Sequence, residues 1–246
     1  MNKTESFGIV QNLPFDVYRQ LPGLNQSTLK HWLSTASNQS DTYKNLEAMQ
    51  FGSAGHCLLL EPGKFEDLYV SAPKGLQQRG KHGKERWAEF CEKHIGKTVL
   101  KANEWDRLQN IRQIFQIHPQ IKKFWDSGKT EVSLFWQDHE FSLDCKARLD
   151  WFEQDSGKIV DLKFTNNVGK VSLQKPIQDY YLVQAAWYSR GVYQLTKKTT
   201  DFIFVFIEKY VPHIIRVVQV SSDDLKNGLQ KIECAIKNIS NAKRDE

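Results

Sequence analysis

Residues 141–151 alternate between apolar and polar side chains, and this pattern restricts the fold more than any other feature of the chain. Successive side chains of a strand point in opposite directions, so each set occupies one face. The apolar face is Phe141, Leu143, Cys145, Ala147 and Leu149, and the polar face is Ser142, Asp144, Lys146, Arg148 and Asp150. A period of two over this length excludes a helix and predicts a half-buried strand.

The same reasoning divides the rest of the chain into strands and helices. Strands are predicted at 131–136, 159–164, 201–208 and 213–220, with a turn at 154–158. Helical patterns cover 14–47 in two pieces, 48–61, 85–95, 103–118, 177–193 and 222–242. Asn25 or Ser27 is expected to cap a helix start, and Pro62 to close the helix over 48–61. The Gly- and Lys-rich stretch 74–86 is expected to form a loop.

This order of elements predicts an α/β (α+β) fold with a central mixed β-sheet flanked by helices. The length of 246 residues fits a single domain over 1–246. Within it we expect a helical N-terminal part over about 14–118, a sheet-containing core over about 130–220 and a C-terminal helix over about 222–242.

Composition and charge narrow the class of protein. With 40% hydrophobic residues and 26% charged residues, the chain is neither disordered nor a fibre. The N-terminus has no apolar signal segment and no run is long enough to span a bilayer, so we expect a cytoplasmic protein without a membrane partner. The net charge of +5 permits a polyanionic partner without requiring one. The four cysteines have no paired spacing, which favours buried thiols over a zinc or iron–sulfur site.

The candidate chemistry lies in the strands on either side of the turn at 154–158. Asp161 and Lys163 are two residues apart, so they share a face, and Asp150 lies on the polar face of the preceding strand. If the strands pair through the turn, the two carboxylates converge and repel each other unless a cation neutralises them. Oxygen ligands of this kind favour Mg²⁺ or Mn²⁺. The ordinary alternative is an exposed ion pair, which is the default for an Asp-x-Lys sequence.

Two acids followed by a lysine are the pattern of a metal-dependent nuclease. The metal lowers the pKa of a bound water and polarises the phosphate, while the lysine offsets charge that develops in the transition state. Gln184 and Tyr188 share one face of the next helix and could support such a site, although a helix surface is their ordinary interpretation. His56 is a candidate neutral ligand only if the fold brings it to the carboxylates; otherwise it is a core histidine.

Five motifs taken in order resemble the nuclease domains of RecE-type phage exonucleases (exonuclease VIII), members of the PD-(D/E)xK superfamily. They are Gly52-x-Ala54-x-His56, Leu60-Glu61-Pro62, Cys145-Lys-Ala-Arg-x-Asp150, Asp161-x-Lys163 and Gln184-x-x-x-Tyr188. The resemblance extends from about residue 23 to about residue 210. Two positions differ from the family pattern: Leu149 stands where proline is frequent, and Gly55 stands where a bulkier residue is frequent.

The resemblance implies a PD-(D/E)xK nuclease core and a role for each matched residue. His56, Asp150 and Asp161 would bind Mg²⁺, with Mn²⁺ as a substitute, and Lys163 would be the catalytic lysine. Gln184 and Tyr188 would support the site and contact the DNA strand, and Glu131 would match an acidic residue that precedes the first core strand. It further implies 5′ to 3′ degradation of linear double-stranded DNA to mononucleotides, a ring-shaped homo-oligomer and a single-strand annealing partner of the RecT type.

Other functions remain open at the level of sequence. A different PD-(D/E)xK endonuclease, an iron–sulfur nuclease that cuts single strands, and an inactive DNA-binding accessory protein share these features. The stretch 74–86 would bind DNA phosphates or simply be a solvated loop. Its basic residues are Lys74, Arg79, Lys81, Lys84 and Arg86.

Overall fold

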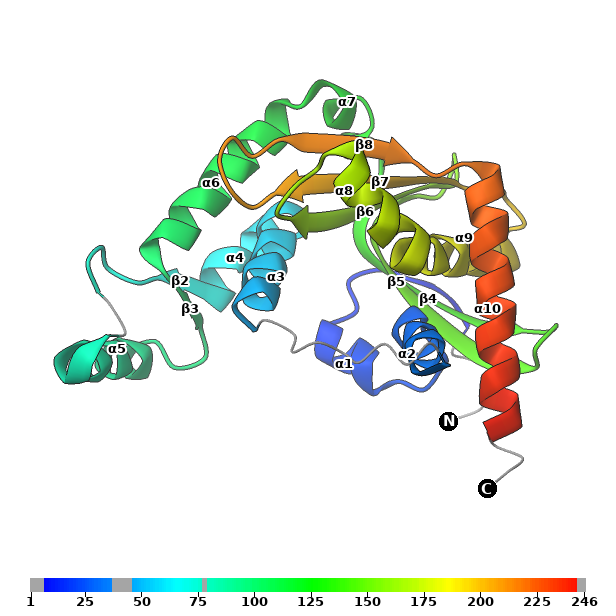
Figure 1. Ribbon diagram of the computed structural model, residues 1–246, viewed down its shortest axis with the longest axis horizontal. Coiled ribbons are helices and arrows are strands. Elements are labelled where there is room, and N and C mark those ends of the chain that lie inside the picture. The colour runs from blue at the N-terminus through cyan, green and yellow to red at the C-terminus, as the bar shows by residue number, and fades with distance from the viewer. Residues whose placement is uncertain (1–6, 37–45, 77–78, 243–246) are drawn as a thin grey trace.

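A six-stranded mixed sheet forms the centre of the protein, as seen in a computed structural model that describes residues 7–36, 46–76 and 79–242 (Figure 1). The strand order is β1-β4-β5-β6-β7-β8, and every neighbouring pair is antiparallel except β6 and β7. The strands are β1 (Gly8–Val10), β4 (Lys129–Asp138), β5 (Leu143–Glu153), β6 (Lys158–Thr165), β7 (Asp201–Glu208) and β8 (Ile215–Gln219). The predicted fold class, a mixed sheet flanked by helices, is therefore confirmed.

Helices pack against both faces of the sheet and enclose two cores. On one face lie α2 (Gln26–Ala36), α9 (Leu182–Thr196) and α10 (Ser222–Ala242), around buried rings that include Trp136 and Trp187. On the other lie α3 (Leu46–Leu60), α4 (Pro62–Leu68), α6 (Ala102–Ile117) and α7 (Pro119–Lys122), around Trp151 and Phe65. Ile159 of β6 belongs to the first core and Val160 and Leu162 to the second, because successive side chains of a strand point to opposite faces.

Smaller elements complete the chain. They are α1 (Phe15–Gln20), β2 (Tyr69–Ser71), α5 (Gly80–Lys93), β3 (Thr98–Leu100), the 3₁₀ turn η1 (Trp125–Ser127), α8 (Lys170–Pro176) and the π-helical turn η2 (Ile177–Tyr181). Strands β2 and β3 form a separate parallel pair, and α5 projects from the body beyond them (Figure 1). Among the described residues, no helix is both long and apolar enough to cross a membrane.

Most predicted elements are found, and the differences have local causes. Asn25 caps α2, accepting the N–H groups of Ser27 and Thr28 at 2.9 and 3.2 Å. The helix predicted over 48–61 ends at Leu60, but Pro62 then begins α4, because the first turn of a helix tolerates a residue without an N–H. Residues 37–45 of the predicted helix over 14–47 lie outside the described residues.

The prediction of a loop over 74–86 is wrong for its second half. Helix α5 begins at Gly80, so Lys81, Lys84 and Arg86 are helical. The residues that follow Gly83, which are Lys, Glu, Arg, Trp and Ala, are adequate helix formers. Their helix propensity outweighs the low propensity of Gly80 and Gly83. The helix predicted over 177–193 consists of the π-helical turn η2 followed by α9, and the additional helix α8 precedes it.

Strands β5 and β6 separate part-way along their length, and this separation positions the candidate site. Their register ends with Trp151 opposite Val160, which leaves Asp150 and Asp161 at the next positions. Beyond that point the edge of β5 pairs with a different segment: Leu24 N–H donates to Asp144 O, and Lys146 N–H donates to Leu24 O, each at 2.8 Å. A gap therefore opens in the sheet between β5 and β6, with Asp150 on one side and Asp161 on the other.

Candidate active site

Asp161 is the most completely held side chain of the candidate site. It is 1% exposed on β6 and faces α9. Gln184 Nε2 of α9 donates to Oδ2 at 3.0 Å and to Oδ1 at 3.2 Å, and Lys163 Nζ donates to both oxygens, to Oδ2 at 2.7 Å. Asp161 and Lys163 share a face of the strand, as their spacing predicts, but the pair is enclosed and is not an exposed ion pair.

Asp150 lies across the gap from Asp161. Its side chain accepts a backbone N–H of β6 that no longer pairs with the backbone of β5. Its Oδ2 accepts the N–H of Leu162 at 2.7 Å. The alternation of β5 shifts by one residue at this point, because Leu149 and Phe152 belong to the core beside α9 whereas Trp151 belongs to the core beside α3. The departure at Leu149 leaves a fully buried core residue in place of the family's proline.

His56 reaches the gap from α3, on the opposite side of the sheet from Gln184. Its Nδ1 lies 3.5 Å from Asp150 Oδ2, and its ring centroid lies 5.7 Å from that of Phe164. Gly55 makes this approach possible: a Cβ at this position would lie 2.3 Å from the Phe164 ring. The second departure from the family pattern thus allows α3 to pack closely on β6.

Burial and a neighbouring like charge both disfavour an ionised Asp150. Burial, and after it the charge of Asp161, raises the pKa of Asp150 to about 8. Burial, and after it the charge of Lys163, lowers the pKa of His56, so its imidazole is neutral. Burial opposes the charge of Lys163, but the carboxylates of Asp161 and Asp150 outweigh burial and raise its pKa. The site therefore favours an added positive charge and contains a neutral nitrogen ligand.

Glu131 adds a third acid beside the gap. It lies in β4 at the position between Thr130 and Val132, which pair with Trp151 and Leu149, so it stands next to Asp150. Its φ of 54° is in the left-handed region, which a non-glycine residue rarely adopts. Burial and then Asp150 raise the pKa of Glu131, while Arg148 forms a close ion pair with it. The sequence match to Glu131 is thus accompanied by proximity to the site.

The donor set has the right chemistry for a divalent cation but is not arranged around one. The carboxylate oxygens suit Mg²⁺ or Mn²⁺, whereas a neutral imidazole is a more usual ligand of transition metals. Among the described residues, however, no three His, Cys, Asp or Glu side chains converge closely enough to hold a metal ion. In addition, Lys163 and Gln184 donate hydrogen bonds to both oxygens of Asp161. Binding a cation through Asp161 requires its carboxylate to exchange part of these contacts.

Gln184 and Tyr188 lie where the helix motif places them, on the face of α9 that packs against β6. They are 5% and 6% exposed, and Tyr188 is coupled electrostatically to both Asp161 and Asp150. Burial raises the pKa of Tyr188 well above its usual value, so its hydroxyl stays protonated. Gln184 holds Asp161 directly and Tyr188 contacts Gln184, while contact of either residue with DNA stays a prediction.

Two residues beside this group, Lys30 and Tyr181, belong to no motif that the sequence reveals. Lys30 of α2 donates from Nζ to Gln184 Oε1 at 3.2 Å, and it lies 5.7 Å from the ring centroid of Tyr181 in η2. Lys163 Nζ lies 5.5 Å from the same ring. No local signal identifies Lys30, because its partner is 154 residues away along the chain. A π-helical turn is a frequent mark of a functional site, but only the backbone reveals it.

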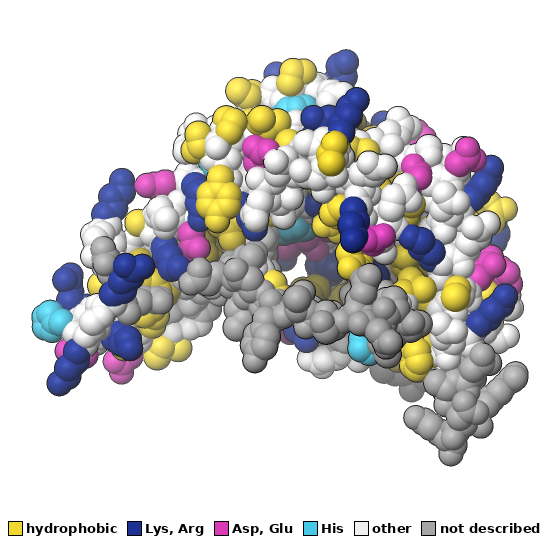
Figure 2. All heavy atoms as spheres, in the orientation of Figure 1, with side chains coloured by type: hydrophobic (Ala, Val, Ile, Leu, Met, Phe, Trp, Pro, Cys, Tyr) yellow, Lys and Arg dark blue, Asp and Glu magenta, His cyan; other side chains and the backbone are white. Residues whose placement is uncertain are grey.

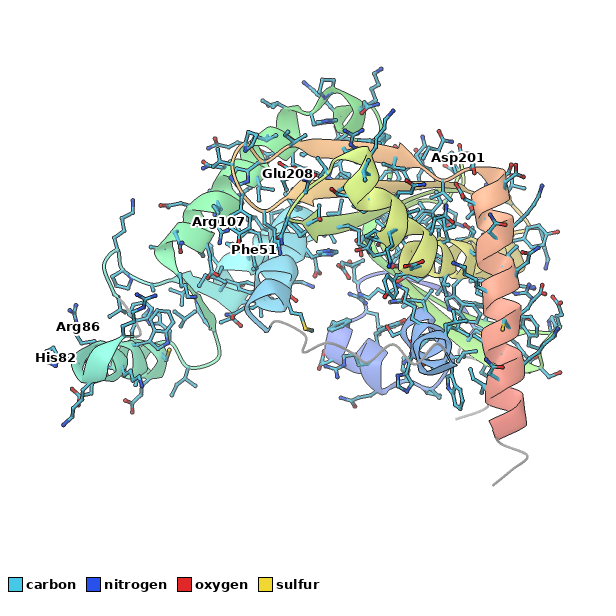
Figure 3. The ribbon with its side chains drawn as sticks, in the orientation of Figure 1. Phe51, His82, Arg86, Arg107, Asp201 and Glu208 are labelled. Carbon is cyan, nitrogen blue, oxygen red and sulfur yellow. The ribbon has the colours of Figure 1, made fainter. Side chains whose placement is uncertain are left out.

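The five basic residues of 74–86 are not part of this cluster. Arg79, Lys81, Lys84 and Arg86 are exposed on or just before α5, and Lys74 lies 3.5 Å from Asp106. Figure 3 shows His82 and Arg86 on the projecting α5, at the end of the molecule away from the sheet. Between that arm and α9, Figure 2 shows a hollow with acidic, basic and histidine side chains visible inside it.

Near His56, helix α3 contacts a group of aromatic and cationic side chains. Arg107 of α6 stacks between Phe51 and Tyr210, with its Cζ 4.7 and 4.8 Å from the two ring centroids (Figure 3). Phe51 in turn meets the edge of Phe164, with ring centroids 6.0 Å apart. These contacts link α6 and the β7–β8 turn to the helix that supplies His56.

The family of PDDEXK-like domains of unknown function (DUF3799) matches residues 23–246 of this chain. The chain belongs to that family. The match confirms the PD-(D/E)xK nuclease superfamily, as the sequence motifs implied, and does not reach the RecE-type subdivision. No curated protein matches the chain.

One solved structure shares this fold. The crystal structure of a candidate exonuclease from Eubacterium rectale superposes with a TM-score of 0.65 at 18% identity, covering 96% of this chain and 88% of that one. At this identity the likeness is one of fold. The structure of the protein SSO0001 gives a TM-score of 0.31 at 11% identity over 85% of each chain, which is too low to indicate a shared fold.

Proposed function

We propose that this protein is a Mg²⁺-dependent exodeoxyribonuclease that degrades linear double-stranded DNA from 5′ to 3′ and leaves a 3′ single strand for recombination. The supporting observation is the gathering of Asp150, Asp161, His56 and Lys163 at the gap between β5 and β6. They come from three elements and from both faces of the sheet. Such an arrangement of buried charges is difficult to account for as packing alone.

In this proposal His56, Asp150 and Asp161 bind Mg²⁺, for which Mn²⁺ can substitute. The cation would lower the pKa of a bound water and polarise the scissile phosphate. Hydrolysis at such a site would join a water oxygen to phosphorus while the P–O3′ bond breaks and the leaving O3′ takes a proton, which would release a 5′-mononucleotide. Lys163 would donate to the phosphate oxygens as negative charge develops on them, while Gln184 holds Asp161 in place and Tyr188 supports Gln184.

The proposal includes the partners expected from the sequence. The phosphates of duplex DNA bind to the exposed basic side chains on and before α5, which suit contacts without sequence preference. These side chains are Lys74, Arg79, Lys81, Lys84 and Arg86. A single-strand annealing protein of the RecT type receives the product strand. The chain works as a homo-oligomeric ring around DNA.

The test is digestion of a linear duplex labelled separately at its 5′ and 3′ ends, beside a covalently closed circle. We expect prompt loss of the 5′ label as mononucleotide with Mg²⁺, no reaction in EDTA and an intact circle. Asp161→Asn should abolish cleavage, whereas the control Asp144→Asn, an exposed acid of the same sheet, should leave it unchanged. A cut circle would instead indicate an endonuclease, and retained DNA binding without any cleavage would indicate an accessory protein.

Metal binding has a test that does not depend on cleavage. Calorimetric titration with Mn²⁺ in the absence of DNA should show binding to the wild-type protein and to Asp144→Asn. Binding should be at least about 10-fold weaker in Asp161→Asn, because a primary oxygen ligand is lost. Equal affinity in all three proteins would remove Asp161 from the metal site.

A further inference from the structure

Lys30 occupies a position that nothing in the nuclease motifs assigns. Its helix α2 is fixed by the Asn25 cap and by Leu29, which is fully buried against the core beside α9. This placement carries the Lys30 ammonium to Gln184 Oε1 at 3.2 Å, behind the residue that holds Asp161. The three side chains form a continuous line from α2 through α9 to β6.

The amide of Gln184 lies between two groups with opposite hydrogen-bonding requirements. In its charged form Lys30 only donates and so meets the amide oxygen, and a carboxylate only accepts, so Asp161 must meet the NH₂ group. Gln184 Nε2 donates to both oxygens of Asp161, as this requires. A 180° rotation of the amide would place oxygen against carboxylate on one side and NH₂ against ammonium on the other. Only one orientation satisfies both neighbours.

A lysine is a costly residue at this position. Burial, and after it the charge of Lys163, lowers the pKa of Lys30 to about 7. A methionine would fill the same space and avoid that penalty, but it would leave Gln184 Oε1 without its donor. The cost of placing a second ammonium near Lys163 is consistent with a role in the site and not in packing.

We propose that Lys30 is a positioning residue that fixes the amide orientation of Gln184, so that its NH₂ group always faces Asp161. Lys30 then controls how the Asp161 carboxylate is presented, without touching the scissile phosphate. This proposal rests on the proposed nuclease function for its kinetic consequences. The orientation of the amide itself is independent of that function.

A double-mutant cycle separates action through Gln184 from direct action on DNA. Lys30→Met should lower kcat about 10- to 100-fold, the usual effect of losing a supporting partner, with KM for the duplex changed less than about 3-fold. Lys30→Arg, another pure donor, should restore most of the rate. In a Gln184→Met background, Lys30→Met should cause no further loss beyond about 2-fold, because the two residues act as one unit. Lys226→Met, an exposed lysine of α10, is the control.

The second measurement does not require activity. The side-chain NH₂ resonances of Gln184, assigned by their absence in Gln184→Met, should be protected from solvent exchange in the wild-type protein. Lys30→Met should reduce that protection at least about 10-fold and Lys30→Arg should retain it, because only a donor holds the amide oxygen in place. Thermal unfolding of each variant checks that the fold is intact.

The outcomes distinguish this proposal from the nuclease proposal. If the wild-type protein cuts no DNA, the nuclease proposal fails, and the protection of the Gln184 amide still decides the role of Lys30. Unchanged protection in Lys30→Met overturns the positioning role. Multiplicative losses in the cycle, with a raised KM, also overturn it and make Lys30 a direct phosphate ligand.

Discussion

At the scale of single residues, the site depends on the absence of a side chain as much as on those present. Gly55 is buried on α3, where a Cβ would lie 2.3 Å from Cζ of Phe164 on β6. This close approach brings His56, the next residue, across to Asp150. The glycine is not a weakness of the helix here, because it sets the distance between α3 and the sheet.

Gly55→Ala should therefore lower both stability and activity. The added methyl group must displace the Phe164 ring or the helix, and overpacking of this kind costs about 1–3 kcal/mol in the free energy of unfolding. Urea unfolding and the cleavage rate measure the two effects. Combining Gly55→Ala with Phe164→Leu should recover most of the loss, and Gly63→Ala, which has open space, serves as the control. A Gly55→Ala protein as stable and active as wild type would contradict this account.

At the scale of elements, α5 differs from every helix that packs on the sheet. It has no buried residue, and it projects from the body at one end of the molecule (Figures 1 and 3). Its first two turns carry Lys81, Lys84 and Arg86 within a chain of modest net charge, +5. An exposed basic helix without a packing role is suited to a long polyanion.

Changing Lys81 and Lys84 to Gln should weaken binding of duplex DNA equally for all sequences. Each phosphate contact contributes about one unit to the slope of log affinity against log salt, so the slope should fall by about 2. The matched control changes Lys226 and Lys237, two exposed lysines of α10, to Gln. Fluorescence anisotropy with Asp161→Asn as the background avoids digestion of the probe. An equal change of slope in test and control proteins would argue against a DNA-binding role for α5.

At the scale of the whole molecule, one buried ion pair fastens the β4–β5 hairpin to α9. Arg190 of α9 donates from Nε to Asp138 Oδ2 at 2.5 Å and from Nη2 to Asp138 Oδ1 at 2.9 Å. Asp138, the last residue of β4, is fully buried. Burial opposes its ionisation, but the hydrogen bonds and charge of Arg190 outweigh burial and lower the pKa of Asp138.

The sign of the pH dependence follows from this lowered pKa. Stabilisation by Asp138 is present above the unfolded pKa of about 3.9 and is lost as the pH falls through the lower folded value. Arg190→Met should lower the free energy of unfolding by about 3–5 kcal/mol at pH 7, since it leaves a buried charge unpaired. The difference from wild type should narrow toward pH 3 as the carboxylate is protonated. Urea unfolding at several pH values measures it, and Arg86→Met, at an exposed arginine, should show no such difference.

The sequence by itself determined the long strands β4 to β8, their faces and the residues of the candidate site that lie on β5 and β6. Alternation over 141–151 and the two-residue spacing of Asp161 and Lys163 are local properties, so they were readable without a fold. The turn at 154–158 then set the register that places Asp150 beside Asp161. Short elements such as β1 and β2, with three residues each, carry too little pattern to be predicted.

Tertiary structure alone decided which distant residues complete the site. The separation of β5 from β6, the left-handed backbone at Glu131 and the contact of Lys30 with Gln184 each depend on segments far apart in the chain. It also decided that Asp161 and Lys163 are enclosed, where their sequence alone favoured an exposed pair. The physical reason is that periodicity encodes which way a side chain points, whereas long-range packing determines what that side chain meets.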